Sequence, residues 1–307
     1  MISIIIPAEK NENYMDRALE SVVDQTYADF EALILHSDTD ALKRAVGQKF
    51  VEDARFRFIE TPKDITAGAA RNIGLEAVAG EYVYFLDSDD YLSSDALQML
   101  IENMDGHPVV RGRMRRTEHD SSEIESAAEQ RLTTIFHLNR YNLVRNHSAL
   151  HFLIKKDLID RLGLKFAEAE QTYSDLMFVI PMLEAVEVVP FVYEALYFRR
   201  RRNDPITHPS LRQMPIEQRM HDMFAIYNRL KQSRLSFEAE KLLDTLLLNF
   251  YRKHLIVKFK NKDEIDVHFE GLQETIRKVN PSVLKTKDKV LQLDVRTIQS
   301  RGRKSVV

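Results

Sequence analysis

Three carboxylates stand within four residues of the stretch VYFLDSDDYL, at positions 83–92. Asp87, Asp89 and Asp90 directly follow an apolar run. Carboxylates this close raise one another's pKa, and a bound cation relieves their repulsion. Mg²⁺ and Mn²⁺ take oxygen ligands, and Mg²⁺ commonly uses one or two carboxylates together with substrate phosphates. The spacing of Asp87 and Asp89 therefore predicts a metal–nucleotide site. A solvated turn is the alternative, because a D-x-D triplet alone is common.

The acidic stretch belongs to a series of elements that alternate in period. Short β-branched or aromatic runs predict strands, and apolar residues at helical spacing follow them. Ser93 or Ser94 is expected to cap the helix after the acidic stretch. The alternation predicts a parallel sheet with helices on both faces, in which ligands bind beyond the carboxyl ends of the strands. The predicted strands are 2–7, 30–35, 56–60 and 81–86, and the helices include 14–25, 69–79 and 94–104.

The pattern loosens after residue 106 and becomes helical towards the end. We expect a strand over 109–116 and a polar loop over 117–130. A second strand with a short helix follows over 149–163, and a longer helix over 171–185. Range 186–202 is expected to form a strand, a turn and a strand. From Pro215 onward the pattern is almost wholly helical. We therefore expect a domain over 1–212 and a helical region over 213–307, which leads to a further domain in a longer native chain.

Composition narrows the function classes. The 307 residues include no cysteine, which excludes disulfides, thiolate nucleophiles and cysteine-based zinc sites. No apolar run approaches the roughly 20 residues of a membrane span, so the expected location is the cytoplasm. Residues 251–307 hold 14 Lys/Arg against 7 Asp/Glu, whereas the net charge of the whole chain is −3. Such a basic end suits peripheral contact with an anionic inner membrane face or a phosphate-rich polymer, and a solvated helical surface is the alternative. Nucleic acid is not expected, because interleaved aromatic residues are lacking.

Several motifs together resemble one enzyme family. They are SIIIP at 3–7, YMDRALESVVDQTYADFEALIL at 14–35, GAARNIGLEAVAGEYVYFLDSDDYL at 68–92, SDLMF at 174–178 and YFRRRRNDPITH at 197–208. The chain resembles the family 2 glycosyltransferases of the GT-A fold, in particular bacterial enzymes of teichoic acid and capsular polysaccharide synthesis. The resemblance covers about the first two thirds of the chain. It implies an α/β, Rossmann-like, mostly parallel sheet followed by helices.

The resemblance also implies roles for particular residues. A nucleotide-sugar donor, UDP-linked by analogy, would lie across the carboxyl edge of the sheet, with Mn²⁺ or Mg²⁺ held by Asp89 and Asp87. Asp175 would be the base that deprotonates a hydroxyl of a polyol-phosphate or polysaccharide acceptor, with inversion at the sugar. Arg71 would lie near the nucleotide, or alternatively form an ion pair between helix and sheet. The donor-binding residues expected from the resemblance are Pro7, Glu9, Asp38, Gly68, Arg71, Asp87, Ser88, Arg202 and His208.

Three departures from the family pattern keep a second hypothesis open. Glu9 and Lys10 replace an aromatic residue and an asparagine. His36 and Ser37 stand where relatives have the base-reading aspartate, so that role is missing or displaced to Asp38. Ser174 replaces the glutamate beside the presumed base. The alternative to an active enzyme is a degenerate GT-A module that serves as a non-catalytic scaffold.

Overall fold

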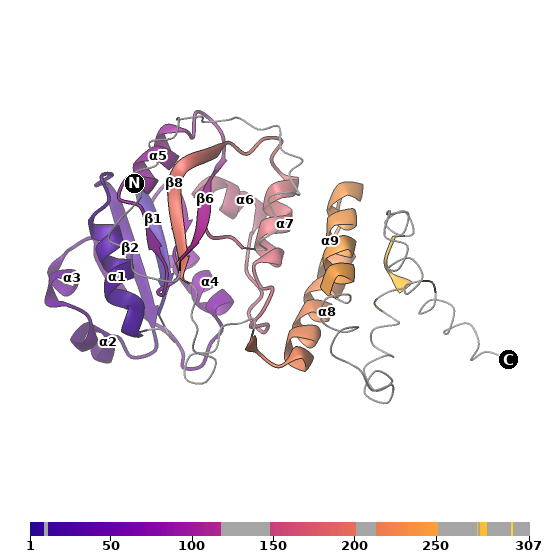
Figure 1. Ribbon diagram of the computed structural model, residues 1–307, viewed down its shortest axis with the longest axis horizontal. Helices are drawn as coiled ribbons and strands as arrows, with labels where there is room; N and C mark the ends of the chain where they lie inside the picture. Colours follow the sequence, from indigo (N-terminus) through magenta and orange to yellow (C-terminus); the bar gives the residue numbers. More distant parts are fainter. Residues whose placement is uncertain are drawn as a thin grey trace. The chain divides into compact units, whose positions relative to one another are not determined.

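A computed structural model describes residues 1–8, 12–117, 148–200, 213–250, 275, 277–280 and 296. The chain divides into two compact units, Met1–Met214 and Pro215–Val307. Figure 1 shows the first unit as a sheet with surrounding helices and the second as helical where it is described.

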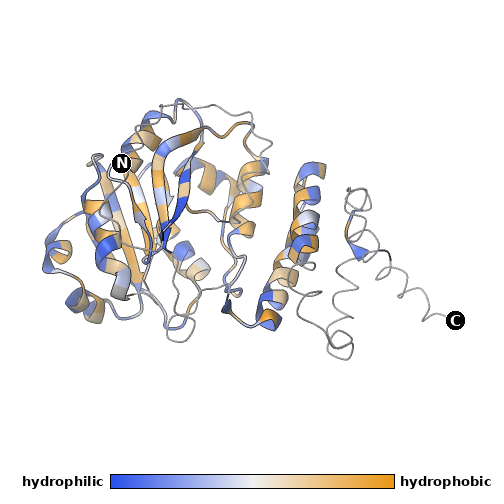
Figure 2. Cartoon of the chain, viewed as in Figure 1, coloured by the Kyte–Doolittle hydropathy of each residue, from blue (hydrophilic) through white to orange (hydrophobic). Residues whose placement is uncertain are grey.

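The half of the sheet that runs from the edge strand β3 to β4 is parallel. Strand β1 (Ile2–Pro7) pairs in parallel with β2 (Phe30–His36) and with β4 (Tyr82–Phe85), and β2 pairs in parallel with β3 (Phe56–Glu60). Every residue of β1 and β2 is buried, so both faces of these strands are covered, as a parallel sheet requires. The orange strands in Figure 2 show this apolar centre.

The second half of the sheet is mixed. Strand β7 (Phe152–Lys155) runs antiparallel to both β4 and β6 (Val109–Thr117), whereas β8 (Phe191–Arg200) is parallel to β6. The short β5 (Tyr91–Leu92) pairs with the end of β8. The strand order is β3-β2-β1-β4-β7-β6-β8-β5. Among the strand pairs of the described residues, four of seven are parallel, and the predicted α/β fold is confirmed.

The helices of unit 1 connect these strands. They are α1 (Glu12–Val23), α2 (Thr39–Ala45), α3 (Gln48–Glu52), α4 (Ala67–Ala77), α5 (Ala96–Glu102), α6 (Lys156–Leu162) and α7 (Leu176–Glu184). Helix α4 packs on β1 and β2, α5 packs on β6 and β8, and α6 packs on α7 and β7. Helix α4 carries Arg71 and Asn72, and Asp175 lies directly before α7.

Three local predictions were wrong. The N-cap of α5 is Asp95, not Ser93 or Ser94, and the Ser93 hydroxyl instead accepts a hydrogen bond from Leu196 N–H. Helix α7 begins at Leu176 rather than 171, because Tyr173 has a φ of 61°, a left-handed conformation that a helix cannot contain. Range 186–202 holds one described strand, β8, since residues 186–190 are irregular.

Unit 2 contains α8 (Ile216–Gln232) and α9 (Phe237–Phe250), which pack on each other. Its buried polar centre is Asp244, which accepts hydrogen bonds from Tyr227 Oη and Asn280 N–H, each at 2.7 Å. Within the described part of the chain, no helix combines the length and apolar character needed to cross a membrane. Most of the basic stretch 251–307 lies outside the described residues.

Candidate active site

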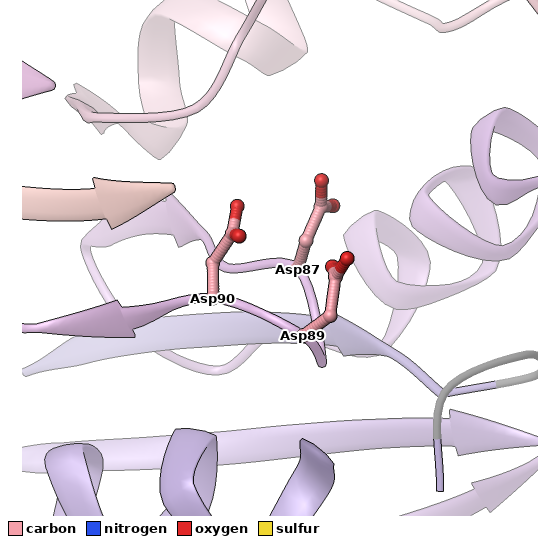
Figure 3. A group of neighbouring side chains, drawn as sticks. All are labelled: Asp87, Asp89 and Asp90. Carbon is pink, nitrogen blue, oxygen red and sulfur yellow. The ribbon is translucent and has the colours of Figure 1, made fainter. Parts of the chain in front are cut away.

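The three aspartates of the DSDD turn converge at the carboxyl end of β4. Asp87, Asp89 and Asp90 each offer an oxygen within 4.8 Å of the others. Figure 3 shows the three carboxylates projecting to the same side of the turn. Asp90 N–H donates to Asp87 O at 3.0 Å, which closes the turn and brings side chains three residues apart together. Like charges this close in a partly buried place favour a cation, as expected from the spacing.

The end of β8 holds this turn in place. Tyr197 Oη donates to Asp90 Oδ2 at 2.7 Å, and Arg200 N–H donates to Asp90 Oδ1 at 2.8 Å. Arg200 Nε donates to Asp89 O at 2.9 Å, so it fixes the backbone of the turn. Burial, followed by the charges of Asp89 and Asp87, raises the pKa of Asp90 well above its usual range. Both oxygens of Asp90 are thus used within the protein, which marks Asp90 as a support for the turn.

Arg71 joins the acidic turn to the aspartate expected to act as base. One terminal nitrogen donates to Asp87 Oδ1 at 2.6 Å and the other donates to Asp175 Oδ1 at 3.1 Å. The Arg71 residue is 5% exposed. Burial would lower the pKa of Arg71, but Asp87 and Asp175 outweigh burial and raise it. The two carboxylates, 88 positions apart in the sequence, therefore share one buried cation.

Helix α4 positions the segment that leads to Asp175. Asn72 Nδ2 donates to Phe166 O at 3.1 Å, and Asn72 Oδ1 accepts from Phe166 N–H at 2.9 Å. Thr66 Oγ1 accepts from Ala69 N–H as the helix cap and donates to Glu168 O. A Cβ at Gly68 would lie 2.2 Å from Ala167 O, so only glycine allows the helix this close. The motif GAARN thus contributes packing contacts as well as Arg71.

Asp175 is held by the backbone on its second oxygen. Ala149 N–H donates to Asp175 Oδ2 at 2.8 Å. Two bulky residues near it have left-handed backbones: Tyr173 at φ 61° and His151 at φ 63°. Such conformations cost of order 1–3 kcal/mol each and cluster at functional sites. A carboxylate has about four acceptor positions. On Asp175, three of them are used by Arg71, by Ala149 N–H and by Ser174 Oγ, which donates to Oδ1 at 3.4 Å.

The remaining predicted residues have different outcomes. Pro7 ends β1 and Ser88 is buried within the acidic turn. Asp38 Oδ1 caps α2 through Ala41 N–H, and Asp38 N–H donates to His36 Nδ1 at 2.9 Å. His36, which departs from the family pattern, therefore helps to hold the turn after β2. The predicted residues Glu9, Arg202 and His208 lie outside the described residues.

Tyr197, Arg200 and the N–H of Ala149 were not predicted. Tyr197 and Arg200 belong to the motif YFRRRRNDPITH at 197–208, from which Arg202 and His208 were selected instead. The signal that could have indicated Tyr197 and Arg200 was their place on β8, a long strand parallel to β6 that ends next to the acidic turn. Ala149 contributes only a backbone group, and no residue type could have indicated it.

The donor set fits a hard divalent cation. The carboxylates of Asp87 and Asp89 supply the oxygens that Mg²⁺ and Mn²⁺ prefer, and among the described residues no histidine joins this cluster. Both carboxylate oxygens of Asp90 bond to Tyr197 and Arg200, so Asp87 and Asp89 are the candidate ligands.

Comparison with known proteins gives one family and one fold. The family described as glycosyl transferase family 2 matches residues 3–163. An uncharacterized glycosyltransferase of Haemophilus influenzae is 27% identical over 189 residues, which cover 61% of this chain and 73% of the relative. The teichoic acid poly(glycerol phosphate) polymerase of Staphylococcus epidermidis is 28% identical over 217 residues, 66% of this chain and 29% of the polymerase. This chain therefore corresponds to less than a third of that polymerase.

Solved structures agree on the fold. Staphylococcus aureus TarS 1–349 in complex with UDP-GlcNAc has a TM-score of 0.72 at 19% identity, with 98% of this chain and 91% of that chain covered. At this identity the likeness concerns the fold alone.

Proposed function

Because the chain belongs to glycosyl transferase family 2, we propose that it transfers a sugar from a UDP-linked donor to a hydroxyl of a cell-surface polymer, with inversion at the anomeric carbon. The observation that carries this proposal is the convergence of Asp87, Asp89 and Asp175 around Arg71. The family motifs of the sequence and the positions of the carboxylates both support a donor site at the acidic turn and a base at Asp175. The donor complex of the TarS fold relative is consistent with a UDP-sugar.

The donor diphosphate is proposed to lie beyond the ends of β1 and β4, next to the acidic turn. Asp89 and Asp87 would hold Mn²⁺ or Mg²⁺, which when bound neutralises charge on the departing nucleoside diphosphate. Arg71 keeps Asp87 oriented through its 2.6 Å ion pair. Pro7, Asp38, Gly68 and Ser88 remain proposed donor-binding residues on the same edge of the sheet.

Asp175 is proposed to act on the acceptor side. It removes the proton from the acceptor hydroxyl as that oxygen bonds to the anomeric carbon and the bond to the diphosphate breaks. Arg71 and Ala149 N–H each bond to one oxygen of Asp175, so the orientation of the carboxylate is fixed. What remains of its acceptor capacity therefore points in a defined direction. The proposed mechanism separates two tasks, since the carboxylates of the turn bind the donor and Asp175 deprotonates the acceptor.

The acceptor is proposed to be a polyol-phosphate or polysaccharide chain. The match to the teichoic acid polymerase supports this class. We also propose that residues 1–212 form the catalytic domain and 213–307 a helical region. A cytoplasmic location with peripheral contact between the basic end and the inner membrane face is proposed from charge alone.

A transfer assay tests the proposal. Purified protein, Mn²⁺ and a panel of UDP-sugars are incubated with glycerol-phosphate oligomers or with neutral oligosaccharides, and products are followed by mass spectrometry. The expected result is a mass increase of one sugar, with NMR showing an anomeric configuration opposite to that of the donor. A product with retained configuration would contradict the role of Asp175. Binding of UDP without any transfer would favour the scaffold alternative.

A further inference from the structure

Arg111 on β6 carries a positive charge that no carboxylate of the described residues neutralises. Its Nε donates to His151 Nε2 at 2.9 Å, and its guanidinium lies over the rings of Phe152 and Phe191, 5.8 and 5.3 Å from their centroids. Within the described ranges no carboxylate lies within ion-pair distance of Arg111. Burial lowers the pKa of Arg111 to about 10, so it remains charged at neutral pH. A desolvated cation without a counter-ion is costly and favours the approach of an anion.

His151 adds a second unfilled group to the same place. It is 1% exposed, and its Nδ1 has no hydrogen-bond partner in the part of the chain that the structure describes. Burial, and then the charges of Arg111 and Arg199, lower the pKa of His151 well below its usual range, so the ring is neutral. Since Nε2 accepts from Arg111, Nδ1 carries the proton and is a buried donor without an acceptor. Buried donors of this kind are rare in native proteins and call for a functional reason.

Arg113 extends the cationic surface along β6. Its guanidinium lies 3.9 Å from the ring centroid of Tyr193, which is 41% exposed. The rings of Tyr193 and Phe191 meet edge to face at 6.0 Å. Arg111, Phe191, Tyr193 and Arg113 therefore form a continuous group, here named the β6 arginine cluster. For Arg113, as for Arg111, the described residues provide no carboxylate partner.

The β6 arginine cluster is connected to the proposed base by a short stretch of backbone. Ala149 N–H donates to Asp175 Oδ2, and two residues later His151 O accepts from Gly112 N–H at 2.8 Å, between the two arginines. Residues 149–151 thus contact both Asp175, through Ala149 N–H, and the strand that carries Arg111 and Arg113, through His151 O. Through its other oxygen, Asp175 pairs with Arg71, which also pairs with Asp87 of the acidic turn.

We propose that the β6 arginine cluster binds an anionic group of the acceptor, a phosphodiester of a polyol-phosphate chain. This inference rests on the proposed function, in which Asp175 faces the acceptor. The planar guanidinium matches a phosphate with paired hydrogen bonds, and its aromatic neighbours hold it flat. A carboxylate of an acidic polysaccharide shares this chemistry and is the competing source. The cluster would select an anionic acceptor over a neutral one.

The test is direct binding of a labelled glycerol-phosphate oligomer, read by fluorescence anisotropy at physiological ionic strength. Arg111→Gln and Arg113→Gln are each expected to weaken binding about tenfold, the effect of losing a charge-assisted hydrogen bond. Arg116→Gln is the matched control, because Arg116 is an exposed arginine of the same strand with the same charge. It should bind within about twofold of the unchanged protein, as expected for a screened surface charge.

Several results would overturn the proposal. Equal weakening by Arg116→Gln would show attraction by overall charge rather than a site. Tighter binding of a uronic acid oligomer of equal charge would assign the cluster to carboxylates. Arg113→Gln should disturb folding less than Arg111→Gln, because the partner ring of Arg113, Tyr193, is exposed. Unchanged binding by Arg113→Gln would therefore refute the β6 arginine cluster as a binding site. UDP binding is measured on the same samples. Failure of UDP to bind the unchanged protein would refute the proposed function, while the oligomer result would still report on the anion site.

Discussion

At Arg71 one buried guanidinium serves two carboxylates that have different proposed tasks. Asp87 belongs to the donor side and Asp175 to the acceptor side, and each bonds to a different terminal nitrogen. A charge buried with two partners resists movement, because separation would leave an uncompensated ion in a low-dielectric place. The arrangement fixes the distance between the two proposed halves of the site before any substrate binds.

Replacement of the proposed base tests its role at this scale. Asp175→Asn keeps size and shape but removes basicity, so kcat should fall by about 10²–10⁴, the usual contribution of a positioned general base. The Asn amide group would face either Arg71 or Ala149 N–H, both donors, so some loss of thermal stability is also expected. Rates with a UDP-sugar and the true acceptor provide the measurement.

UDP affinity is the control for Asp175→Asn, since the donor side should remain intact. An Asn variant that transfers sugar at close to the original rate would place the base elsewhere. Glu168 would be examined next, although its Oε1 already accepts from Asn72 Nδ2 at 2.8 Å.

Residue types and spacing singled out Asp87 and Asp89, and the family resemblance singled out Asp175, but their connection through Arg71 could not be predicted. Asp87 and Asp89 stand at a strand end, where carboxylates are informative. Arg71 was assigned either to the nucleotide or to an ion pair, and the structure shows the ion pairs. The supporting groups Tyr197 and Ala149 N–H reach the site only through tertiary contacts, which leave no local pattern.

At the scale of elements, Glu31 fastens several parts of the parallel sheet together. Its Oε1 accepts from Ser3 Oγ of β1 and from Ala79 N–H after α4, each at 2.6 Å, and its Oε2 pairs with Arg57 of β3 at 2.7 Å. Burial would raise the pKa of Glu31, but these bonds outweigh it and the pKa is lowered. A buried carboxylate thus joins β1, β2, β3 and the turn before β4.

Glu31→Gln should destabilise the protein at neutral pH by about 1–3 kcal/mol, because a charged acceptor of three donors becomes a neutral amide. The folded pKa lies below the unfolded value, so the contribution of Glu31 is complete above about pH 4.5 and is lost as pH falls through the folded pKa. Urea unfolding at several pH values measures this. Equal pH slopes of the two proteins between pH 5 and pH 3 would contradict the account.

Hydrophobic periodicity and turn residues were sufficient to predict the strands of the parallel half of the sheet. They failed where tertiary contacts decide whether a segment forms a strand. Predicted strands 2–7 and 56–60 match β1 and β3 residue for residue. Residues 186–190 were misread because Val186 and Val189 are buried, 4% and 3% exposed, without belonging to a strand. A buried apolar run indicates a strand only when a neighbouring strand pairs with it.

At the scale of the whole molecule, the two units have separate buried centres. In unit 2, Lys231 Nζ lies 3.3 Å from Asp244 Oδ1, and Asp244 is fully buried. The helical character of the region after Pro215 could be predicted from period alone. The polar centre could not, since a buried aspartate on a helix resembles any solvated one in the sequence.

Asp244→Ala tests whether the two units are independent domains. The loss of Asp244 leaves Tyr227 Oη and Asn280 N–H without their acceptor and removes an ion-pair partner of Lys231. Unit 2 should lose about 3–5 kcal/mol, the usual effect of breaking a buried pair. Calorimetry should show one transition lowered, whereas UDP affinity stays unchanged. Loss of UDP binding in proportion to the loss of stability would show that the units do not act separately.

The central claim is that the acidic turn binds a metal–nucleotide complex. Titration calorimetry with UDP, with and without Mn²⁺, compares the unchanged protein with Asp89→Asn and with the control Asp105→Asn, an exposed turn residue before β6. The Asp89 backbone keeps its bond from Arg200 Nε in the variant, so the turn should persist. We expect Mn²⁺ to strengthen UDP binding by the unchanged protein and the control, and to have no effect on Asp89→Asn. Mn²⁺-dependent UDP binding that survives in Asp89→Asn would contradict the claim.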